Sequence, residues 1–135
     1  MSADDIAAVI STFVGEVNGG EIASALARFT ADVTIVEDLA PYRWQGPEAG
    51  GHWLAAMAAN AERMGVSSVI MDLGPAERIE VEGPAAYAIF AGTVVFDRPE
   101  GPLYESGRLT FALVDQGGAW RIAALTWTGE APSAR

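Results

Sequence analysis

The sequence has no cysteine and a single histidine, His52. Without cysteine the chain forms no disulfide and carries no thiolate nucleophile. A zinc site with one histidine would depend on carboxylates for its other ligands, so we predict no metal and no other cofactor. His52 is expected on the solvent edge of a helix, beside Ala56 and Ala59, rather than in a catalytic site.

Basic residues are scarce, with 8 Lys and Arg against 18 Asp and Glu and a net charge of −10. Nucleic acids and anionic membranes require basic patches, so neither is an expected partner. Long apolar runs are also missing, and the start "MSADDIAAVI" lacks the basic region of a signal peptide. We therefore expect a cytoplasmic protein.

The 135 residues, half of them apolar, suit one globular domain spanning residues 1–135. Helical spacing of apolar residues predicts helices over 4–18, 21–29 and 46–64. Asp4 or Asp5 would cap the first helix, and Pro47 suits the first turn of the third. A run rich in β-branched residues predicts a strand over 32–38.

After Gly65 the pattern changes to strands over 66–73, 76–82, 85–97, 103–115 and 119–129, punctuated by Gly and Pro. Helices followed by antiparallel strands indicate an α+β fold. In the strand 85–97 neither face is polar, so both should be covered. We expect the face with Tyr87 and Thr93 to line a cavity. The opposite face would mediate a homodimer through Phe90, Val94, Phe96 and Phe111.

Three stretches, "FTADVTIVED", "YRWQGPEAGGHWL" and "ESGRLTFALVDQGGAWRIAALTWTG", resemble the NTF2-like superfamily of SnoaL-like proteins and ketosteroid isomerases. The resemblance covers nearly the whole chain. It implies a cone in which three N-terminal helices pack on a curved antiparallel sheet. This fold hosts isomerases, cyclases, hydrolases, ligand binders and catalytically silent proteins, so it does not determine the activity.

The ketosteroid isomerases imply roles for individual positions. With their helix-ending asparagine set on Asn18, the general base falls on Glu37. Their oxyanion-donating tyrosine falls on Phe13, which cannot donate a hydrogen bond. The second oxyanion donor falls near Thr110. SnoaL-like histidines on the last strand are replaced here by Ala124 and Thr126, which removes another acid–base group.

The two adjacent acids Glu37 and Asp38 are the candidate catalytic residues. Glu37 follows Val33 and Ile35 at period two, so it should share their inner face. Burial would raise its pKa and make it a general base. Alternatively, both acids simply end a strand in a polar turn, and Asp38 points away unless a bulge intervenes.

Further residues are candidates for a ligand-binding site. Arg108 shares the face of Thr110 and either pairs with Glu37 inside the cone or lies on the surface. The remaining candidates are aromatic, sulfur-containing or hydroxyl side chains near the expected cavity: Phe13, Tyr42, Trp44, Trp53, Met57, Tyr87, Thr93, Thr126 and Trp127. Alternatively, Trp53 and Met57 simply belong to the apolar stripe by which a helix packs on the core. For the last strand, the sequence does not determine which face lines the cavity. Either Thr126 or its neighbour Trp127 does so.

The sequence thus predicts a homodimeric SnoaL-like protein with an apolar pocket for a small hydrophobic organic molecule. Whether it is an enzyme is left open. If it is one, the expected reaction is cofactor-independent proton transfer of isomerase, cyclase or hydratase type, with Glu37 as base. The alternative is a non-catalytic ligand-binding or dimerisation module of the same fold.

Overall fold

The computed structural model describes residues 2–135 and has three helices and six strands. The elements, in chain order, are α1 (Ala3–Asn18), α2 (Ile22–Leu26), β1 (Phe29–Val36), β2 (Arg43–Gln45), α3 (Ala49–Met64), β3 (Ser68–Glu82), β4 (Ala85–Asp97), β5 (Leu103–Gln116) and β6 (Ala119–Gly129). The predicted α+β fold of N-terminal helices on a curved, mostly antiparallel sheet is confirmed.

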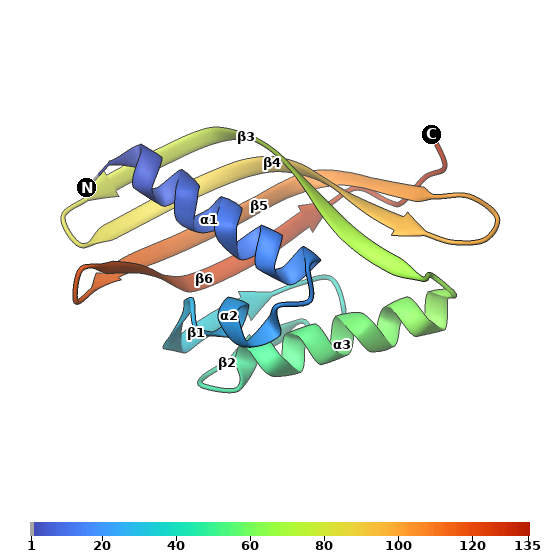
Figure 1. Cartoon of the computed structure of the whole chain (residues 1–135), viewed down its shortest axis with the longest axis horizontal. Coiled ribbons are helices and arrows are strands. Elements are labelled where there is room, and N and C mark those ends of the chain that lie inside the picture. The colour runs from blue at the N-terminus through green and yellow to red at the C-terminus, as the bar shows by residue number, and fades with distance from the viewer. Residues whose placement is uncertain (1) are drawn as a thin grey trace.

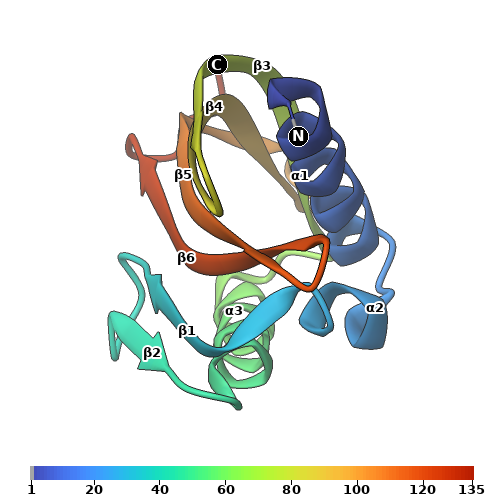
Figure 2. The ribbon, with the colours of Figure 1, turned by 90° about the vertical axis from the view of Figure 1, so that its left-hand side faces the viewer.

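The sheet has the strand order β2-β1-β6-β5-β4-β3 and is antiparallel except between β1 and β6. In Figure 1, α1 runs across the strands from β3 to β6, while α2 and α3 gather beside β1 and β2. Figure 2 shows that the sheet curls strongly from β3 round to β1. The side chains between the helices and this curled sheet form the core.

Helix α1 is placed by its apolar stripe, because Ile6, Ile10 and Phe13 are all buried. Its N-cap is Ser2 rather than either predicted aspartate. Asp5 instead completes a capping box, accepting a hydrogen bond from the backbone N–H of Ser2 at 2.9 Å.

At its other end, α1 is tied to the neighbouring β3 by Asn18. Its amide donates to the Met71 carbonyl at 2.8 Å and accepts from the Met71 N–H at 3.0 Å. Because β3 is an edge strand, this two-point bond satisfies the backbone groups of Met71 that no neighbouring strand can pair. It also fixes the end of α1 beside the cavity described below.

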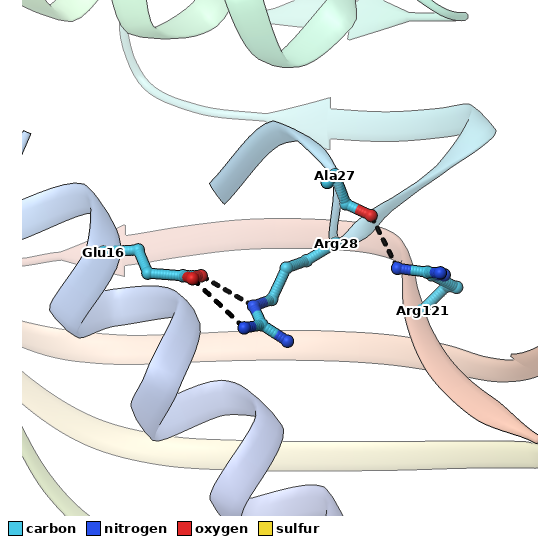
Figure 3. Close-up of polar contacts among 4 residues, drawn as sticks. All are labelled: Glu16, Ala27, Arg28 and Arg121. Carbon is cyan, nitrogen blue, oxygen red and sulfur yellow. Dashed lines mark hydrogen bonds and ion pairs between the residues drawn. The ribbon is translucent and has the colours of Figure 1, made fainter. Parts of the chain in front are cut away.

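An ion pair connects α1 with the start of β1 (Figure 3). Nε of Arg28 lies 2.6 Å from a carboxylate oxygen of Glu16, and Arg121 on β6 donates to the Ala27 carbonyl at 2.7 Å. The bond to Arg28 holds the pKa of Glu16 below its usual value. These contacts hold the segment before β1 against both α1 and β6.

Element boundaries differ from the predictions in several places. Phe29, predicted at the end of the second helix, begins β1, and α2 ends at Leu26. The two strands predicted over 66–73 and 76–82 are one strand, β3, with irregular pairing around Gly74-Pro75. Gly74 sits where a Cβ would lie 2.9 Å from the Ala91 carbonyl oxygen. The short strand β2 was not predicted, and α3 starts after Pro47, at Ala49.

None of the helices described here is long and apolar enough to cross a membrane.

The predicted faces of β4 are wrong. Ala86, Ala88 and Phe90 are buried on the core side, whereas Tyr87 on the opposite side is 40% exposed. The core side of β4 carries two alanines beside Phe90, so side-chain size does not indicate which face is inside. The predicted dimer surface of Phe90, Val94, Phe96 and Phe111 therefore lies on the inner side of the sheet, where Phe90 and Phe111 are in edge-to-face contact.

Candidate functional site

Glu37 follows the last residue of β1 and continues the inward-facing series of Val33 and Ile35. Its carboxylate Oε2 accepts a hydrogen bond of 2.8 Å from the indole Nε1–H of Trp53 on α3. Burial raises the pKa of Glu37 to about 7; the Trp53 bond opposes this, and the charges of Asp38 and Glu105 add to it. Glu37 is thus a carboxyl group able to exchange a proton near neutral pH.

A small cavity lies on the inner side of Glu37, between α1, α3 and the sheet. We call it the inner chamber; its volume is about 80 Å³. It is lined by Phe13, Val14, Val17, Asn18, Glu37, Trp53, Met57, Val69, Met71, Val94, Leu109, Leu125 and Trp127. Glu37 is the only ionisable group among them, so the chamber suits an apolar ligand or part of one.

A second cavity of about 90 Å³, the outer chamber, adjoins the first. Its lining is Glu37, Asp38, Leu39, Met57, Asn60, Ala61, Val69, Val94, Phe96, Glu105 and Trp127. Five of these residues also line the inner chamber: Glu37, Met57, Val69, Val94 and Trp127. Glu37 therefore stands at the junction between an apolar inner chamber and an acidic outer one.

Glu105, on β5, forms the second carboxylate–indole pair of the site. Its Oε2 accepts a hydrogen bond of 2.7 Å from Nε1–H of Trp127, and the residue is only 8% exposed. Burial raises the pKa of Glu105, the Trp127 bond opposes this, and the charge of Asp38 adds to it. Both buried acids of the site are thus held by neutral donors rather than by arginines.

Three glycines on adjacent strands make room for this pair. A Cβ on Gly107 would lie 2.8 Å from the Trp127 ring and would also collide with the Thr128 carbonyl oxygen. A Cβ on Gly129 would lie 2.6 Å from Nε1 of Trp127 and would collide with the Glu105 carboxylate, and one on Gly92 would lie 2.8 Å from Sδ of Met71. The glycines on β4, β5 and β6 thus create the recess that Trp127 and Glu105 occupy.

The structure brings six of the predicted site residues together. Glu37, Phe13, Trp53, Met57 and Trp127 line the inner chamber, and Asp38 joins the outer one. The open parity of the last strand resolves with Trp127 inside and Thr126 outside. Trp53 belongs to the core and Met57 packs against it, so the core stripe of α3 and the cavity wall coincide.

Other predicted site residues lie elsewhere. Arg108 points outward and binds Glu77 at 2.6 Å, so it does not pair with Glu37. Tyr42 is 60% exposed in the turn between β1 and β2, and Trp44 is buried outside both chambers. Tyr87, Thr93, Thr110 and Thr126 all lie on the outer side of the sheet, because they have the opposite parity to the buried residues of their strands.

Sequence reasoning did not select Glu105, although a signal was present. Glu105, Gly107, Leu109, Phe111 and Leu113 alternate along β5, and the last three are buried. An acid on the apolar face of a strand, two residues from a glycine, indicates an inward carboxylate with space around it. His52 is exposed, as expected, and lines a separate cleft beside Pro47 and Gly51.

The described part of the chain, residues 2–135, has no group of three or more His, Cys, Asp or Glu side chains that could hold a metal ion. Asp38, Glu37 and Glu105 therefore share a cavity without forming a metal-binding cluster. The prediction that the protein needs no metal or other cofactor stays a prediction.

No known sequence family and no curated protein matches the chain. Among solved structures, an NTF2-like protein with a cystatin-like fold from Novosphingobium aromaticivorans has a TM-score of 0.78 at 16% identity, covering 97% of this chain and 83% of that one. A type-3 hexachlorocyclohexane dehydrochlorinase from Novosphingobium barchaimii LL02 has a TM-score of 0.78 at 14% identity, covering 96% and 87%. An NTF2-like protein of unknown function from Pseudomonas putida KT2440 has a TM-score of 0.73 at 18% identity, covering 93% and 84%.

Proposed function

The fold is NTF2-like, and within it we propose that the protein binds a small apolar organic molecule and transfers a proton with Glu37 as general base. The observation that carries the proposal is the position of Glu37 in the wall of an apolar cavity, held by Trp53 and without a cationic partner among residues 2–135. A base works best when its pKa is near the working pH, and the pKa of Glu37 is about 7.

The chemistry open to such a site is abstraction of a proton from carbon. Glu37 Oε1 is free to take the proton while Oε2 is held by Trp53. The proton then returns to another carbon, as in isomerisation, or a leaving group departs, as in elimination. A solved structure of similar fold is named as a dehydrochlorinase, a reaction that removes a proton and chloride, which supports the second type. No cofactor is needed for either step.

A specific observation favours the alternative of a binding module without catalysis. Each chamber holds less than 100 Å³, whereas pockets for drug-sized ligands measure roughly 300–1,000 Å³. Phe13 also lines the inner chamber without offering a hydrogen-bond donor for a developing oxyanion. A protein that retains the cavity, but lacks space for a larger substrate and a donor for an oxyanion, would bind a ligand and leave it unchanged.

Binding and catalysis can be tested in sequence. A thermal-shift screen with small neutral apolar compounds should find stabilising ligands, and Val17→Phe, which fills the inner chamber, should abolish the shift. Ile22→Phe, exposed on α2 and outside both chambers and the outer-face groove, is the matched control and should retain it. If no compound stabilises the wild type, or if Val17→Phe leaves the shift intact, the proposed pocket is wrong.

Proton transfer can then be measured without knowing the product. A ligand from the screen is incubated with the protein in D₂O, and exchange of its carbon-bound hydrogens is followed by NMR. Exchange that depends on Glu37 and is lost in Glu37→Gln supports the general base. Binding without exchange supports the non-catalytic alternative.

We propose in addition that the protein is a homodimer that pairs through the outer face of the sheet. A groove on this face is lined by uncharged residues: Thr34, Val36, Tyr87, Thr110, Phe111, Ala112, Ala124, Leu125 and Thr126. In a chain of net charge −10, an uncharged groove reduces the repulsion between two copies that meet there. Sedimentation at micromolar concentration should give a dimeric mass, and Thr126→Arg should give a monomer; a monomeric wild type would rule the dimer out.

The cytoplasmic location also stays a prediction.

A further inference from the structure

The cavity carries negative charge that no side chain balances. Glu37, Asp38 and Glu105 all line the outer chamber. The four ion pairs of residues 2–135 lie elsewhere, between Arg28 and Glu16, Arg78 and Glu80, Arg98 and Glu100, and Arg108 and Glu77. Two neighbouring arginines are exposed: Arg63 donates to Asn60 of the chamber lining at 3.3 Å, and Arg43 on β2 pairs with Val36, the residue before Glu37. The three carboxylates therefore face the cavity without a counterion.

Glu105 provides a second and independent indication. It is more than nine-tenths buried and lines the outer chamber, yet only its Oε2 has a hydrogen bond. Its Oε1 has no protein partner in the described part of the chain. This oxygen is not among the fully buried atoms that lack a partner, so it keeps accessible surface, and it can accept from a cationic group supplied from outside the protein. The recess formed by Gly92, Gly107 and Gly129 keeps this carboxylate in place.

The walls of the cavity supply the complementary apolar contacts. The Trp127 side chain lines both chambers, and Trp53 lines the inner one. Indole rings attract cations through their faces and also pack against hydrocarbon. The outer chamber is thus acidic and partly aromatic, and the inner chamber is apolar. This combination fits a molecule with a positive charge at one end only.

We propose that the ligand is a small hydrophobic cation, an amine or a quaternary ammonium compound. Its charged head lies in the outer chamber between Asp38 and Glu105, and its apolar body occupies the inner chamber beside Glu37. This inference rests on the proposed function and narrows it, because it names the ligand class of the same cavity. A neutral hydrocarbon would leave the carboxylates unpaired, and an anion would be repelled.

A cation bound in the outer chamber also changes the protonation of Glu37, the proposed base. Glu37 is faced by Asp38 from the β1–β2 turn, by Glu105 from β5 and by the Trp53 N–H from α3. The neighbouring Arg43 and Arg63 are exposed and form no ion pair with these acids in the described part of the chain. A bound cation lowers the pKa of Glu37 and so favours its ionised form. Binding of the cation therefore releases a proton near neutral pH and prepares the carboxylate to act as a base.

The experiment uses benzyltrimethylammonium, whose charge does not change with pH, and neopentylbenzene, its neutral isostere. Both are titrated into the protein and followed by NMR at about pH 5.5 and about pH 8. Because the pKa of Glu37 is about 7, the cation should bind about tenfold more tightly at the higher pH. The affinity of the neutral compound should not change.

Two variants locate the charge. Glu105→Gln and Asp38→Asn should each weaken the cation about tenfold and leave neopentylbenzene unaffected. Glu82→Gln, exposed at the opposite end of β3 from Val69, makes the same change in net charge and should leave both affinities as they are. Asp38 is exposed, so its variant remains informative if Glu105→Gln is poorly folded.

Equal affinity for the cation and its neutral isostere would overturn the cationic ligand while the apolar pocket of the proposed function stands. The same conclusion follows if Glu82→Gln weakens the cation as much as Asp38→Asn does. If neither probe binds and no neutral compound stabilises the protein, the pocket itself fails. The two proposals therefore fail by different results.

Discussion

The carboxylates on the two sides of the curled sheet have different partners. On the inner side, the acid groups of Glu37 and Glu105 accept hydrogen bonds from the neutral indoles of Trp53 and Trp127. On the outer side, Glu77 is paired with Arg108 at 2.6 Å. A guanidinium group stabilises the charged form of a carboxylate far more than an indole does. The two acids of the cavity thus lack an arginine partner, whereas Glu77 on the outer side and Glu16 on α1 each have one.

This difference predicts opposite responses to pH. An acid whose pKa is raised on folding binds more protons in the folded than in the unfolded state between the two pKa values. Glu37, raised to about 7 from 4.5, therefore makes the protein less stable as pH rises through this interval. Glu16, whose pKa is lowered by Arg28, contributes stability above its unfolded pKa and loses it as pH falls through its folded pKa.

The largest effect is expected from Glu37→Gln. Removing the buried charge should raise the free energy of unfolding at about pH 8 by about 1–3 kcal/mol, because one pKa unit corresponds to about 1.4 kcal/mol and Glu37 is not fully buried. At about pH 4 the variant and wild type should have similar stability. Urea unfolding at both pH values measures this. Glu82→Gln, exposed and outside the cavity, is the matched control and should not change the pH dependence.

A loss of stability in Glu37→Gln at alkaline pH would contradict this prediction. It would indicate a charged partner for Glu37. The sequence alone left both outcomes open, because Arg108 could point either way. In the structure Arg108 pairs with Glu77, which leaves burial as the main influence on the pKa of Glu37.

The next effect concerns the glycine recess around Trp127. Gly107→Ala should lower the free energy of unfolding by about 1–3 kcal/mol, because the new methyl group collides with the Trp127 ring and with backbone that cannot move away. Gly15→Ala, in the exposed middle of α1 with open space around it, is the matched control and should stabilise by about 0.5–1 kcal/mol. Urea unfolding of both variants should therefore give changes of opposite sign.

A smaller effect is expected from Trp53→Phe, which keeps a ring in the inner chamber and removes only the N–H that binds Glu37. The pKa of Glu37 should rise further, because the lost bond favoured the charged form. Stability at about pH 8 should fall by about 1–2 kcal/mol, as expected for a buried carboxylate that loses a donor. NMR titration of the Glu37 side-chain carbon measures the pKa directly, and an unchanged pKa would show that the indole does not hold the charge.

Most of the fold could be predicted from the sequence. The strands over 85–97 and 119–129 have the predicted bounds, since Gly-Pro and Gly-Gly turns delimit them clearly. Strand β2 was missed because three residues carry no periodicity. The inner face of β4 was assigned wrongly because both faces are apolar. Period two shows which residues share a face, but it does not show which face is covered by α1.

The candidate site was predictable only in part, for the same reason. Glu37 continues a series of buried residues on β1, so its direction followed from Val33 and Ile35. Trp53 could be placed beside it only after the packing of α3 on β1 was known, since the hydrogen bond joins residues from two elements. Thr110 was assigned through the resemblance and Arg108 through sharing its face, but in the register of β5 both lie on the outer side of the sheet. Contacts between strands and helices depend on such registers, which local sequence does not determine.

The smallest effect belongs to the outer ion pair. Glu77→Gln removes the partner of Arg108, but both side chains are well exposed, so water takes over the lost interaction. The urea midpoint should therefore shift by less than in any of the variants above, and the small shift should disappear at high salt because screening removes the attraction of exposed charges. Arg108 is itself well exposed, so the loss of Glu77 leaves no buried charge without a partner. A midpoint shift as large as that of Gly107→Ala, or one that persists in high salt, would mean that the outer pair is a structural contact. The contrast between buried acids held by indoles and exposed acids held by arginines would then not explain where the reactive carboxylates lie.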